Sequence, residues 1–203
     1  MKIIAIGRNY AAHAKELGNP VPEDPVIFLK PDTAVLKDNK DFYYPEFSKN
    51  IHFELEVVLR VSKEGKHIQP KFAHQYYDQV GIGIDFTARD VQQNLKEKGL
   101  PWELAKAFDH SAVVSELKPK ENYPDPDKLN FHLILNGKEV QTGNTASMLF
   151  SFADIISFVS KRITLRKGDL IYTGTPPGVG PIQMGDHLEG FLEGEKLLDF
   201  NIK

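Results

Sequence analysis

The chain has 203 residues, a formal net charge of −3 and no cysteine. A chain of this length usually forms one domain and can enclose a sizeable core. The lack of cysteine excludes disulfides, thiolate metal sites and a cysteine nucleophile. The weakly acidic balance gives no basic field for a nucleic-acid partner. We therefore expect a single domain over residues 1–203 that binds no nucleic acid.

Hydrophobic segments long enough for export or membrane insertion are missing from the sequence. The apolar run at the N-terminus, residues 3–6, is short and is followed by polar side chains, whereas a signal peptide needs a longer apolar region. No stretch approaches the ~18 consecutive apolar residues of a membrane-spanning helix. These features predict a cytoplasmic protein without a membrane partner.

Residues 1–100 are predicted to form short strands and two helices. Hydrophobic periodicity and the positions of glycine and proline predict strands at 2–6, 26–30, 33–36, 53–62 and 80–86, and helices at 10–17 and 87–98. In 53–62 the apolar side chains alternate with others, so that Glu54 and Glu56 share one face of the strand.

The second half of the chain contains two predicted hairpins and one well-marked helix. Asn136-Gly137 joins strands at 129–135 and 138–142, and 193–195 joins two more strands near the C-terminus. Ser151, followed three residues later by Asp154, is placed to cap a helix at 151–162. A further strand is expected at 169–173. The order of elements predicts a strand-rich α+β fold.

Three carboxylates are candidates for a metal site. Glu54 and Glu56 on one strand face repel each other unless a cation lies between them, and magnesium, manganese and calcium prefer such oxygen ligands. A solvated acidic strand face, paired with Arg60, explains the same spacing. Asp85 ends a strand that contains two glycines, which often mark the close approach of a ligand. It could complete a metal site or cap the helix that begins near Thr87.

Other polar side chains suggest catalysis or binding. His13 and Glu16 lie three apart on one helix face, an arrangement that suits a general base held by a carboxylate but also an ordinary surface pair. Lys106, among apolar neighbours, could stabilise developing negative charge or keep its amine in water. The loop 173–180 offers glycine amides and threonine hydroxyls to an anion, although a tight turn has the same composition. It is not a P-loop.

The order of these motifs resembles that of the fumarylacetoacetate hydrolase family. The resemblance covers essentially the whole chain and is carried by the motifs at 7–16, 25–31, 53–56, 83–92, 100–109 and 168–180. It is strongest to the short members of acylpyruvase and oxaloacetate decarboxylase type. It implies the family's mixed β-sandwich roll with short peripheral helices, assembled as a homodimer.

The resemblance also implies roles for individual residues. The matching positions are Glu54, Glu56 and Asp85 for the metal, His13, Glu16 and Lys106 for catalysis, and Arg89, Gln92 and Thr175 for substrate binding. The metal would be one divalent cation, Mg²⁺ in the first place, with Mn²⁺ or Ca²⁺ as alternatives. The segment that carries His13 would close over the substrate as a lid.

The implied substrate is a small 2-oxo acid with a second carbonyl or carboxylate group. The implied reaction is metal-dependent hydrolysis of an acylpyruvate to pyruvate and a carboxylic acid, together with decarboxylation of oxaloacetate. Two alternatives remain open at this point. One is isomerisation or decarboxylation of a compound such as 2-hydroxyhepta-2,4-diene-1,7-dioate, and the other is binding of a metal and a 2-oxo acid without catalysis.

Overall fold

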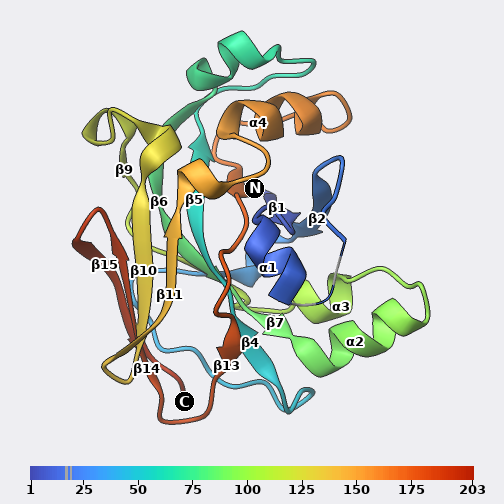
Figure 1. Ribbon diagram of the computed structural model, residues 1–203, viewed down its shortest axis with the longest axis vertical. Helices are drawn as coiled ribbons and strands as arrows, with labels where there is room; N and C mark the ends of the chain where they lie inside the picture. The colour runs from blue at the N-terminus through green and yellow to red at the C-terminus, as the bar shows by residue number, and fades with distance from the viewer. Residues whose placement is uncertain (17, 19) are drawn as a thin grey trace.

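Three β-sheets organise the computed structural model, which describes residues 1–16, 18 and 20–203 (Figure 1). The large sheet takes, in order, β2 (Val26–Lys30), β1 (Ile3–Gly7), β12 (Leu170–Tyr172), β5 (Leu55–Val61), β6 (Tyr77–Asp85), β8 (Ala112–Val114) and β3 (Val35–Leu36), with β9 (Lys118–Pro119) paired to β6. The second sheet consists of β11 (Lys138–Asn144), β10 (Asn130–Leu135), β14 (His187–Leu192) and β15 (Glu195–Asn201). The third consists of β13 (Gly180–Pro181), β4 (Ile51–Phe53) and β7 (Thr87–Ala88).

The large sheet is mixed, because β1 runs parallel to β12 and antiparallel to β2. Its longest pairing is the antiparallel one between β5 and β6, in which Glu56 lies opposite Gly83. A Cβ atom at Gly83 would lie 2.5 Å from the carbonyl oxygen of Val113 and 2.7 Å from the ring of Tyr172. Only glycine fits there, which explains one of the two glycines in this strand.

Both faces of the central strand β5 are buried. Side chains such as Val57 and Leu59 face the four-stranded sheet and belong to the main core, together with Leu133 and Leu188. Val58 faces the other way, into a smaller apolar cluster on the outer side of the large sheet. The alternation of side chains predicted from the sequence is therefore present, but neither face of the strand is exposed to solvent.

Short helices lie around the sheets in the described part of the chain. The α-helices are α1 (Ala11–Glu16), α2 (Arg89–Glu97), α3 (Glu103–Lys106) and α4 (Phe152–Ser160). The 3-10 helices are η1 (Asp32–Ala34), η2 (Pro70–Gln75), η3 (Lys120–Asn122), η4 (Pro126–Lys128) and η5 (Thr145–Ser147). None of these helices is long and apolar enough to cross a membrane. The prediction of a strand-rich α+β fold with short peripheral helices is confirmed.

Elements with strong local signals form where they were predicted. Ser151 and Asp154 make a reciprocal capping box at the start of α4. Asn136 and Gly137 both have positive φ, 51° and 79°, in the turn between β10 and β11, as a two-residue hairpin turn requires. The first helix was predicted at 10–17, and its last residue, like position 19, lies outside the described residues.

Most predicted boundaries differ from the observed ones by one to three residues, and for three elements the difference has a clear structural reason. Residues 33–36 begin as η1, because the amide of Ala34 donates to the carbonyl of Pro31, and only the last two residues pair as β3. The strand at 53–62 is interrupted at Glu54, where the chain passes from the third sheet to the large one. The helix at 87–98 starts two residues later than predicted, because its first residues form β7 and pair with β4.

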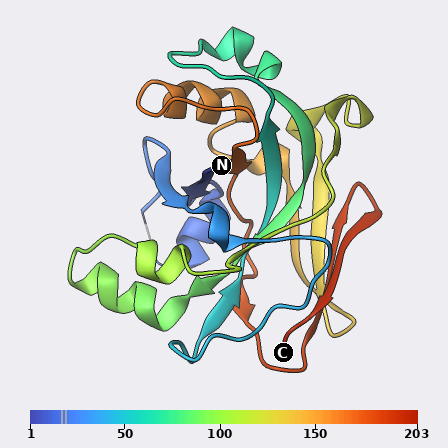
Figure 2. The ribbon, with the colours of Figure 1, turned by 180° about the vertical axis from the view of Figure 1, so that it is seen from behind.

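One long connection ties the large sheet to the second sheet. After β3 the chain crosses β6 toward β15 on the side of the sheet that faces the viewer in Figure 2. Phe42 forms a parallel bridge with Ile202, and its amide donates to the carbonyl of Asn201. This crossing fixes the C-terminal strand against the outer edge of the fold.

Candidate metal centre and substrate pocket

The three candidate carboxylates converge in the interior. Glu54 occupies the break between β4 and β5, Glu56 lies on β5, and Asp85 ends β6. Each offers an oxygen atom, and these atoms lie within 4.8 Å of one another. The residues are 6%, 2% and 0% exposed. The alternative of a solvated acidic strand face is therefore wrong, and so is the expected partner, since Arg60 pairs with Asp78 instead.

Two buried lysines bind these carboxylates. Lys106 Nζ lies 2.8 Å from Glu54 Oε2 and 2.6 Å from Asp85 Oδ2, and it also donates to the hydroxyl of Thr87. Lys30 Nζ lies 2.6 Å from Asp85 Oδ1. The expectation that Lys106 could keep its amine in water is wrong, because the residue is 2% exposed. Asp85 binds these lysines and does not cap α2, whose N-cap is Ala88.

The two lysines respond differently to burial. Burial lowers the pKa of Lys106, but the Asp85 and Glu54 carboxylates outweigh it and raise the pKa above its ordinary value. For Lys30, burial outweighs Asp85 and the pKa is lowered. The pKa of Glu54 falls, although burial alone would raise it, because Lys106 and Arg89 stabilise its charged form. Glu54 and Lys106 are thus held as a charged pair.

Glu56 differs from the other two carboxylates because it lacks a cationic hydrogen-bond partner among the described residues. It accepts one hydrogen bond, 2.7 Å long, from the amide of Gly174. Burial, and then the Asp85 and Glu54 carboxylates, raise the pKa of Glu56 well above its ordinary value. A buried carboxylate beside two others is unfavourable unless a cation joins them. The all-oxygen donor set and this unmatched charge fit a hard divalent cation.

His13 and Glu16 form the predicted pair on α1. The His13 Nδ1 and Glu16 Oε2 atoms are 3.2 Å apart, and His13 is buried. Glu16 also accepts a hydrogen bond, 3.0 Å long, from the amide of Gly178. The glycine amides of the loop 173–180 therefore do bind anions, but these are the carboxylates of Glu16 and, through Gly174, of Glu56.

Thr175 is held by a residue that sequence reasoning missed. Its hydroxyl oxygen accepts a hydrogen bond from Gln141 Nε2 at 2.9 Å, so its own proton is free for another acceptor. The Oε1 atom of Gln141 accepts from the amide of Leu55, next to the first carboxylate. Gln141 is buried in an otherwise ordinary hairpin strand, and nothing in its local sequence marks it as part of the site. Lys30 was missed because it is simply the last residue of an apolar strand and has no polar neighbour there that would mark it.

A narrow cavity of about 30 Å³ opens beside this centre. Of the predicted site residues it is lined by His13, Glu54, Arg89, Gln92 and Lys106. Thr175 lies outside its lining, on the side where Gln141 contacts the carboxylate strand. Within it, Arg89 donates to Glu54 Oε1 at 2.6 Å and to Gln92 Oε1 at 2.8 Å.

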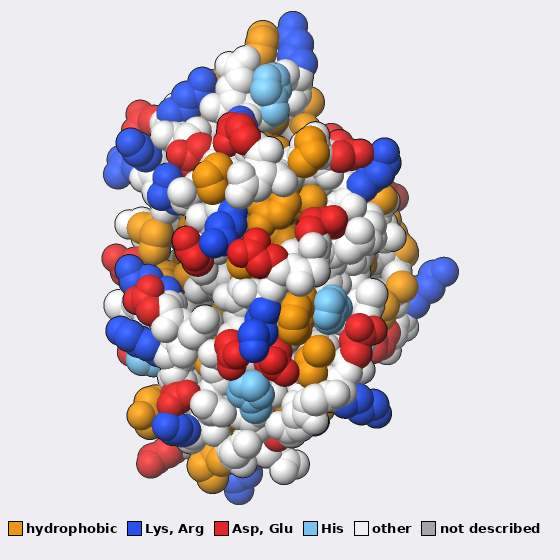
Figure 3. All heavy atoms as spheres, turned by 90° about the vertical axis from the view of Figure 1, so that its left-hand side faces the viewer, with side chains coloured by type: hydrophobic (Ala, Val, Ile, Leu, Met, Phe, Trp, Pro, Cys, Tyr) orange, Lys and Arg blue, Asp and Glu red, His pale blue; other side chains and the backbone are white. Residues whose placement is uncertain are grey.

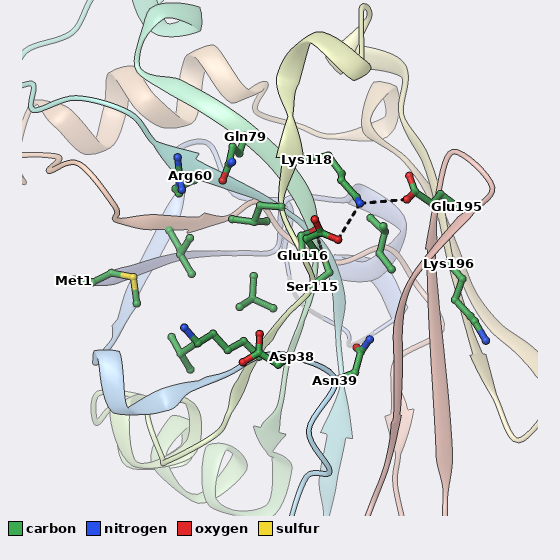
Figure 4. Close-up of a pocket in the computed structure, with 16 residues that line it drawn as sticks. Met1, Asp38, Asn39, Arg60, Gln79, Ser115, Glu116, Lys118, Glu195 and Lys196 are labelled. Carbon is green, nitrogen blue, oxygen red and sulfur yellow. Dashed lines mark hydrogen bonds and ion pairs between the residues drawn. The ribbon is translucent and has the colours of Figure 1, made fainter.

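A much larger cavity lies elsewhere, on the outer side of the large sheet. It measures about 700 Å³ and is lined by residues of β9 and β15 and their neighbours (Figure 4). None of the predicted site residues reaches it. Its lysine at position 118 pairs with Glu116 at 2.9 Å and with Glu195 at 3.5 Å. Size alone therefore does not identify the reactive site in this molecule.

Residues 2–198 match the family model described as fumarylacetoacetate (FAA) hydrolase C-terminal. This chain belongs to the fumarylacetoacetate hydrolase family. A curated relative in the family, the mitochondrial oxaloacetate tautomerase FAHD1 of Mus musculus, is 46% identical over 99% of this chain and 91% of its own length. The human protein of the same name is 44% identical over the same shares of the two chains.

Solved structures of the family superimpose closely on this fold. A family member from Yersinia pestis has a TM-score of 0.96 and 35% identity, covering 100% of this chain and 93% of its own. A fumarylpyruvate hydrolase from Pseudomonas aeruginosa, crystallised with Mn²⁺ and pyruvate, has a TM-score of 0.95 and 35% identity, covering 100% and 89%. The predicted fold and resemblance are confirmed, and the protein is a family enzyme with a buried acidic site suited to a divalent metal.

Proposed function

We propose that the protein is a metal-dependent enzyme that cleaves a C–C bond in small 2-oxo acids. Its metal ligands would be Glu54, Glu56 and Asp85, with Mg²⁺ as the cation and Mn²⁺ or Ca²⁺ as alternatives. The observation that carries the proposal is the buried Glu56, which has two carboxylate neighbours and no cationic hydrogen-bond partner among the described residues. The related hydrolase crystallised with Mn²⁺ and pyruvate supports both the ion and the substrate class.

The proposed reactions are hydrolysis of an acylpyruvate to pyruvate and a carboxylic acid, and decarboxylation of oxaloacetate. A bound divalent cation would polarise the 2-keto group and offset the negative charge that develops there. Lys106 lies on the same carboxylates and would donate a hydrogen bond to the developing anion. A preorganised donor of this kind typically contributes about 10²–10³ in kcat.

His13 is proposed as the base that activates water for hydrolysis. Its Nδ1 atom faces Glu16, which would orient the ring and stabilise its protonated form. Arg89, Gln92 and Thr175 would hold the substrate. The cavity of about 30 Å³ has room for about one water molecule and none for a four-carbon acid. We expect α1, which carries His13 to this cavity, to move when a substrate enters, in line with the lid prediction.

A second candidate is proton transfer without bond cleavage. It is favoured by the names of two relatives, the mouse oxaloacetate tautomerase and a 2-hydroxyhepta-2,4-diene-1,7-dioate isomerase from Mycobacterium marinum. Both reactions would use the same stabilised enolate and would return the proton at another carbon. Such a reaction would need His13 as a proton carrier but no attacking water.

The deciding experiment assays metal-stripped protein, reloaded with Mg²⁺ or Mn²⁺, on acetylpyruvate, oxaloacetate and a 2-hydroxydienedioate. The proposal expects pyruvate from the first two substrates, formed only when metal is present. Isomerised dienedioate or enol-to-keto conversion without pyruvate release would favour the second candidate. Saturable binding without turnover of any of the three would indicate a binding protein, and undiminished activity without metal would contradict the metal assignment.

Four further predictions stay proposals. Residues 1–203 are proposed to act as one catalytic domain, in a homodimer, supported by the resemblance that spans the chain. A cytoplasmic location, without nucleic-acid or membrane partners, is supported by the composition and the apolar pattern. Sedimentation of the purified protein would test the homodimer directly.

A further inference from the structure

The mouth of the substrate cavity carries two cationic side chains that have no role so far. Arg8 follows β1 and Lys96 lies on α2, and both line the cavity beside Trp102. Both cationic groups lie near the Trp102 ring: Arg8 Cζ is 5.7 Å from the ring centroid and Lys96 Nζ is 5.5 Å from it. All three residues are half-buried. We call Arg8, Lys96 and Trp102 the cationic rim.

The rim differs from the inner cations in lacking carboxylate partners. Arg89 and Lys106 both form ion pairs with Glu54. Neither Arg8 nor Lys96 forms an ion pair with a carboxylate of the described residues. Like charges gathered at a narrow opening repel each other and favour the arrival of an anion.

The titration of Lys96 agrees with this crowding of positive charge. Burial lowers the pKa of Lys96, and Arg89, Arg8 and Lys106 lower it further, while Glu54 is the carboxylate that acts against them. A bound anion at the rim would relieve this effect. The charge distribution thus leaves room for negative charge at the outer end of the cavity.

The backbone conformation of Arg8 and the packing of Trp102 both support a functional role for the cationic rim. Arg8 has a φ of 61°, a left-handed conformation that is uncommon for residues other than glycine. Such strain in a non-glycine residue tends to mark a functional position. The Trp102 ring is seated against Phe28, with a centroid separation of 6.1 Å, and lies 3.6 Å from where a Gly7 Cβ would be. The ring is therefore a fixed support for both cations.

We propose that Arg8 and Lys96 bind a carboxylate at the end of the substrate remote from Glu54, Glu56 and Asp85. The inference rests on the proposed function and narrows its substrate class to 2-oxo acids with a second, terminal carboxylate. Acylpyruvates that end in a methyl group would bind less well, because their outer end would leave both cations unpaired. Arg8 and Lys96 are then specificity-determining residues, with Trp102 positioning them.

A matched pair of ligands tests this directly. 2-Oxoglutarate and 2-oxopentanoate have the same five-carbon chain and the same 2-oxo acid end, and differ only in a terminal carboxylate or methyl group. Titration calorimetry on Mg²⁺-loaded protein is expected to give at least about tenfold tighter binding of 2-oxoglutarate, the effect of one charged hydrogen bond. The preference should shrink between 50 mM and 500 mM salt, because the rim is half-exposed.

The variants are Arg8→Asn, whose asparagine tolerates a positive φ, and Lys96→Gln. Each is expected to weaken 2-oxoglutarate binding about tenfold and to change 2-oxopentanoate binding less than twofold. Arg8→Lys should keep part of the preference. Lys98→Gln, an exposed change of the same charge next to α2, is the control and should change neither. Thermal unfolding of each variant verifies that it is folded.

The outcomes separate this inference from the proposed function. Equal binding of the two ligands, no binding of either, or equal losses on both in the variants would overturn the rim as a carboxylate site. Binding that is unchanged after metal removal, or no turnover in the substrate panel, would overturn the proposed function. A dicarboxylate preference that disappears in Arg8→Asn would still support the rim in that case.

Discussion

Two regions of this molecule contain the same kinds of ion pair in different surroundings. In the buried site, Lys106 lies 2.6 Å from Asp85, and the two side chains are 3% and 0% exposed. On the surface of β14 and β15, Lys196 also lies 2.6 Å from Asp199, but these side chains are 42% and 41% exposed. Figure 3 faces this surface and shows basic and acidic side chains side by side. The separation of two charges therefore does not identify a site.

The two histidine–carboxylate pairs lead to the same conclusion. His187 lies 2.7 Å from Asp199 on the surface, closer than the 3.2 Å between His13 and Glu16. The surface pair is partly exposed, whereas His13 is buried in the cavity beside Glu54. What distinguishes the site is burial together with a carboxylate, Glu56, that has no cationic hydrogen-bond partner among the described residues, not the length of any one ion pair. The two regions supply matched variants for testing this.

The largest expected effect is that of Glu56→Gln in the buried site. It removes a proposed ligand, so divalent metal affinity should fall more than about 100-fold, the upper value for losing an outer partner of a metal ligand. Metal-dependent turnover should be lost with it. The matched surface change, Glu116→Gln, should alter neither. Titration with Mn²⁺ and initial-rate assays measure both quantities.

Stability of the metal-free protein adds a second readout for Glu56→Gln. The neutral amide replaces a carboxyl whose charged form is disfavoured by burial and by the Asp85 and Glu54 carboxylates, so the melting temperature without metal should stay the same or rise. A wild-type response to metal in this variant would place the ion somewhere else.

The next effect is that of Lys106→Met, measured by urea unfolding. Loss of this amine leaves Glu54 and Asp85 buried with one cation fewer. Breaking a buried pair typically costs about 3–5 kcal/mol of unfolding free energy. Lys196→Met removes a lysine with ion pairs of similar length from the exposed surface and should leave the unfolding midpoint unchanged. Equal losses of unfolding free energy in the two variants would contradict the claim that the buried ion pairs contribute more stability than the surface pairs.

His13→Ala tests the two histidine pairs by activity. Loss of a general base typically reduces the rate about 10²–10⁴-fold, and this loss is expected for acylpyruvate hydrolysis. Oxaloacetate decarboxylation should fall much less, since it needs no attacking water. His187→Ala should leave both rates unchanged. A similar loss on both substrates in His13→Ala would contradict the assignment of His13 as the base that activates water.

The smallest effect concerns the pH dependence of the surface region. Hydrogen bonds from Lys196 and His187 hold the pKa of Asp199 below its ordinary 3.8. A carboxyl whose pKa is lower in the folded state than in the unfolded state stabilises the fold at any pH above its unfolded-state pKa. This contribution is lost as the pH falls through the folded-state pKa. Asp199→Asn should therefore lower stability slightly at neutral pH and no longer do so well below pH 3.8. Urea unfolding at several pH values, in low and high salt, measures this; a salt-independent difference would contradict a screened surface pair.

Much of the fold followed from local signals in the chain. The Ser151 and Asp154 capping box, the Asn136-Gly137 turn and the spacing of Glu54 and Glu56 each depend on neighbours within a few residues. Such signals act through backbone geometry and side-chain periodicity, so they are readable without knowing what packs nearby. The motif order added the family and, with it, the candidate site residues.

Contacts between distant parts of the chain could not be predicted. Lys30 meets Asp85 from a different strand, and Gln141 bonds to the amide of Leu55 from a hairpin in another sheet. Nothing in their local sequences marks these partners, because any buried polar group needs a partner but does not specify which one. The same holds for the cationic rim of Arg8, Lys96 and Trp102.

The sequence by itself determined the strand-rich fold class, the family and the identity of the three carboxylates. The tertiary structure decided that these carboxylates are dry, that Glu56 alone lacks a cationic hydrogen-bond partner among the described residues, and that His13 lines their cavity. The physical reason is that burial and charge balance are properties of assembled surroundings. The pKa of a carboxylate is shifted, and a metal ion becomes favourable beside it, only when distant segments of the chain exclude water around it.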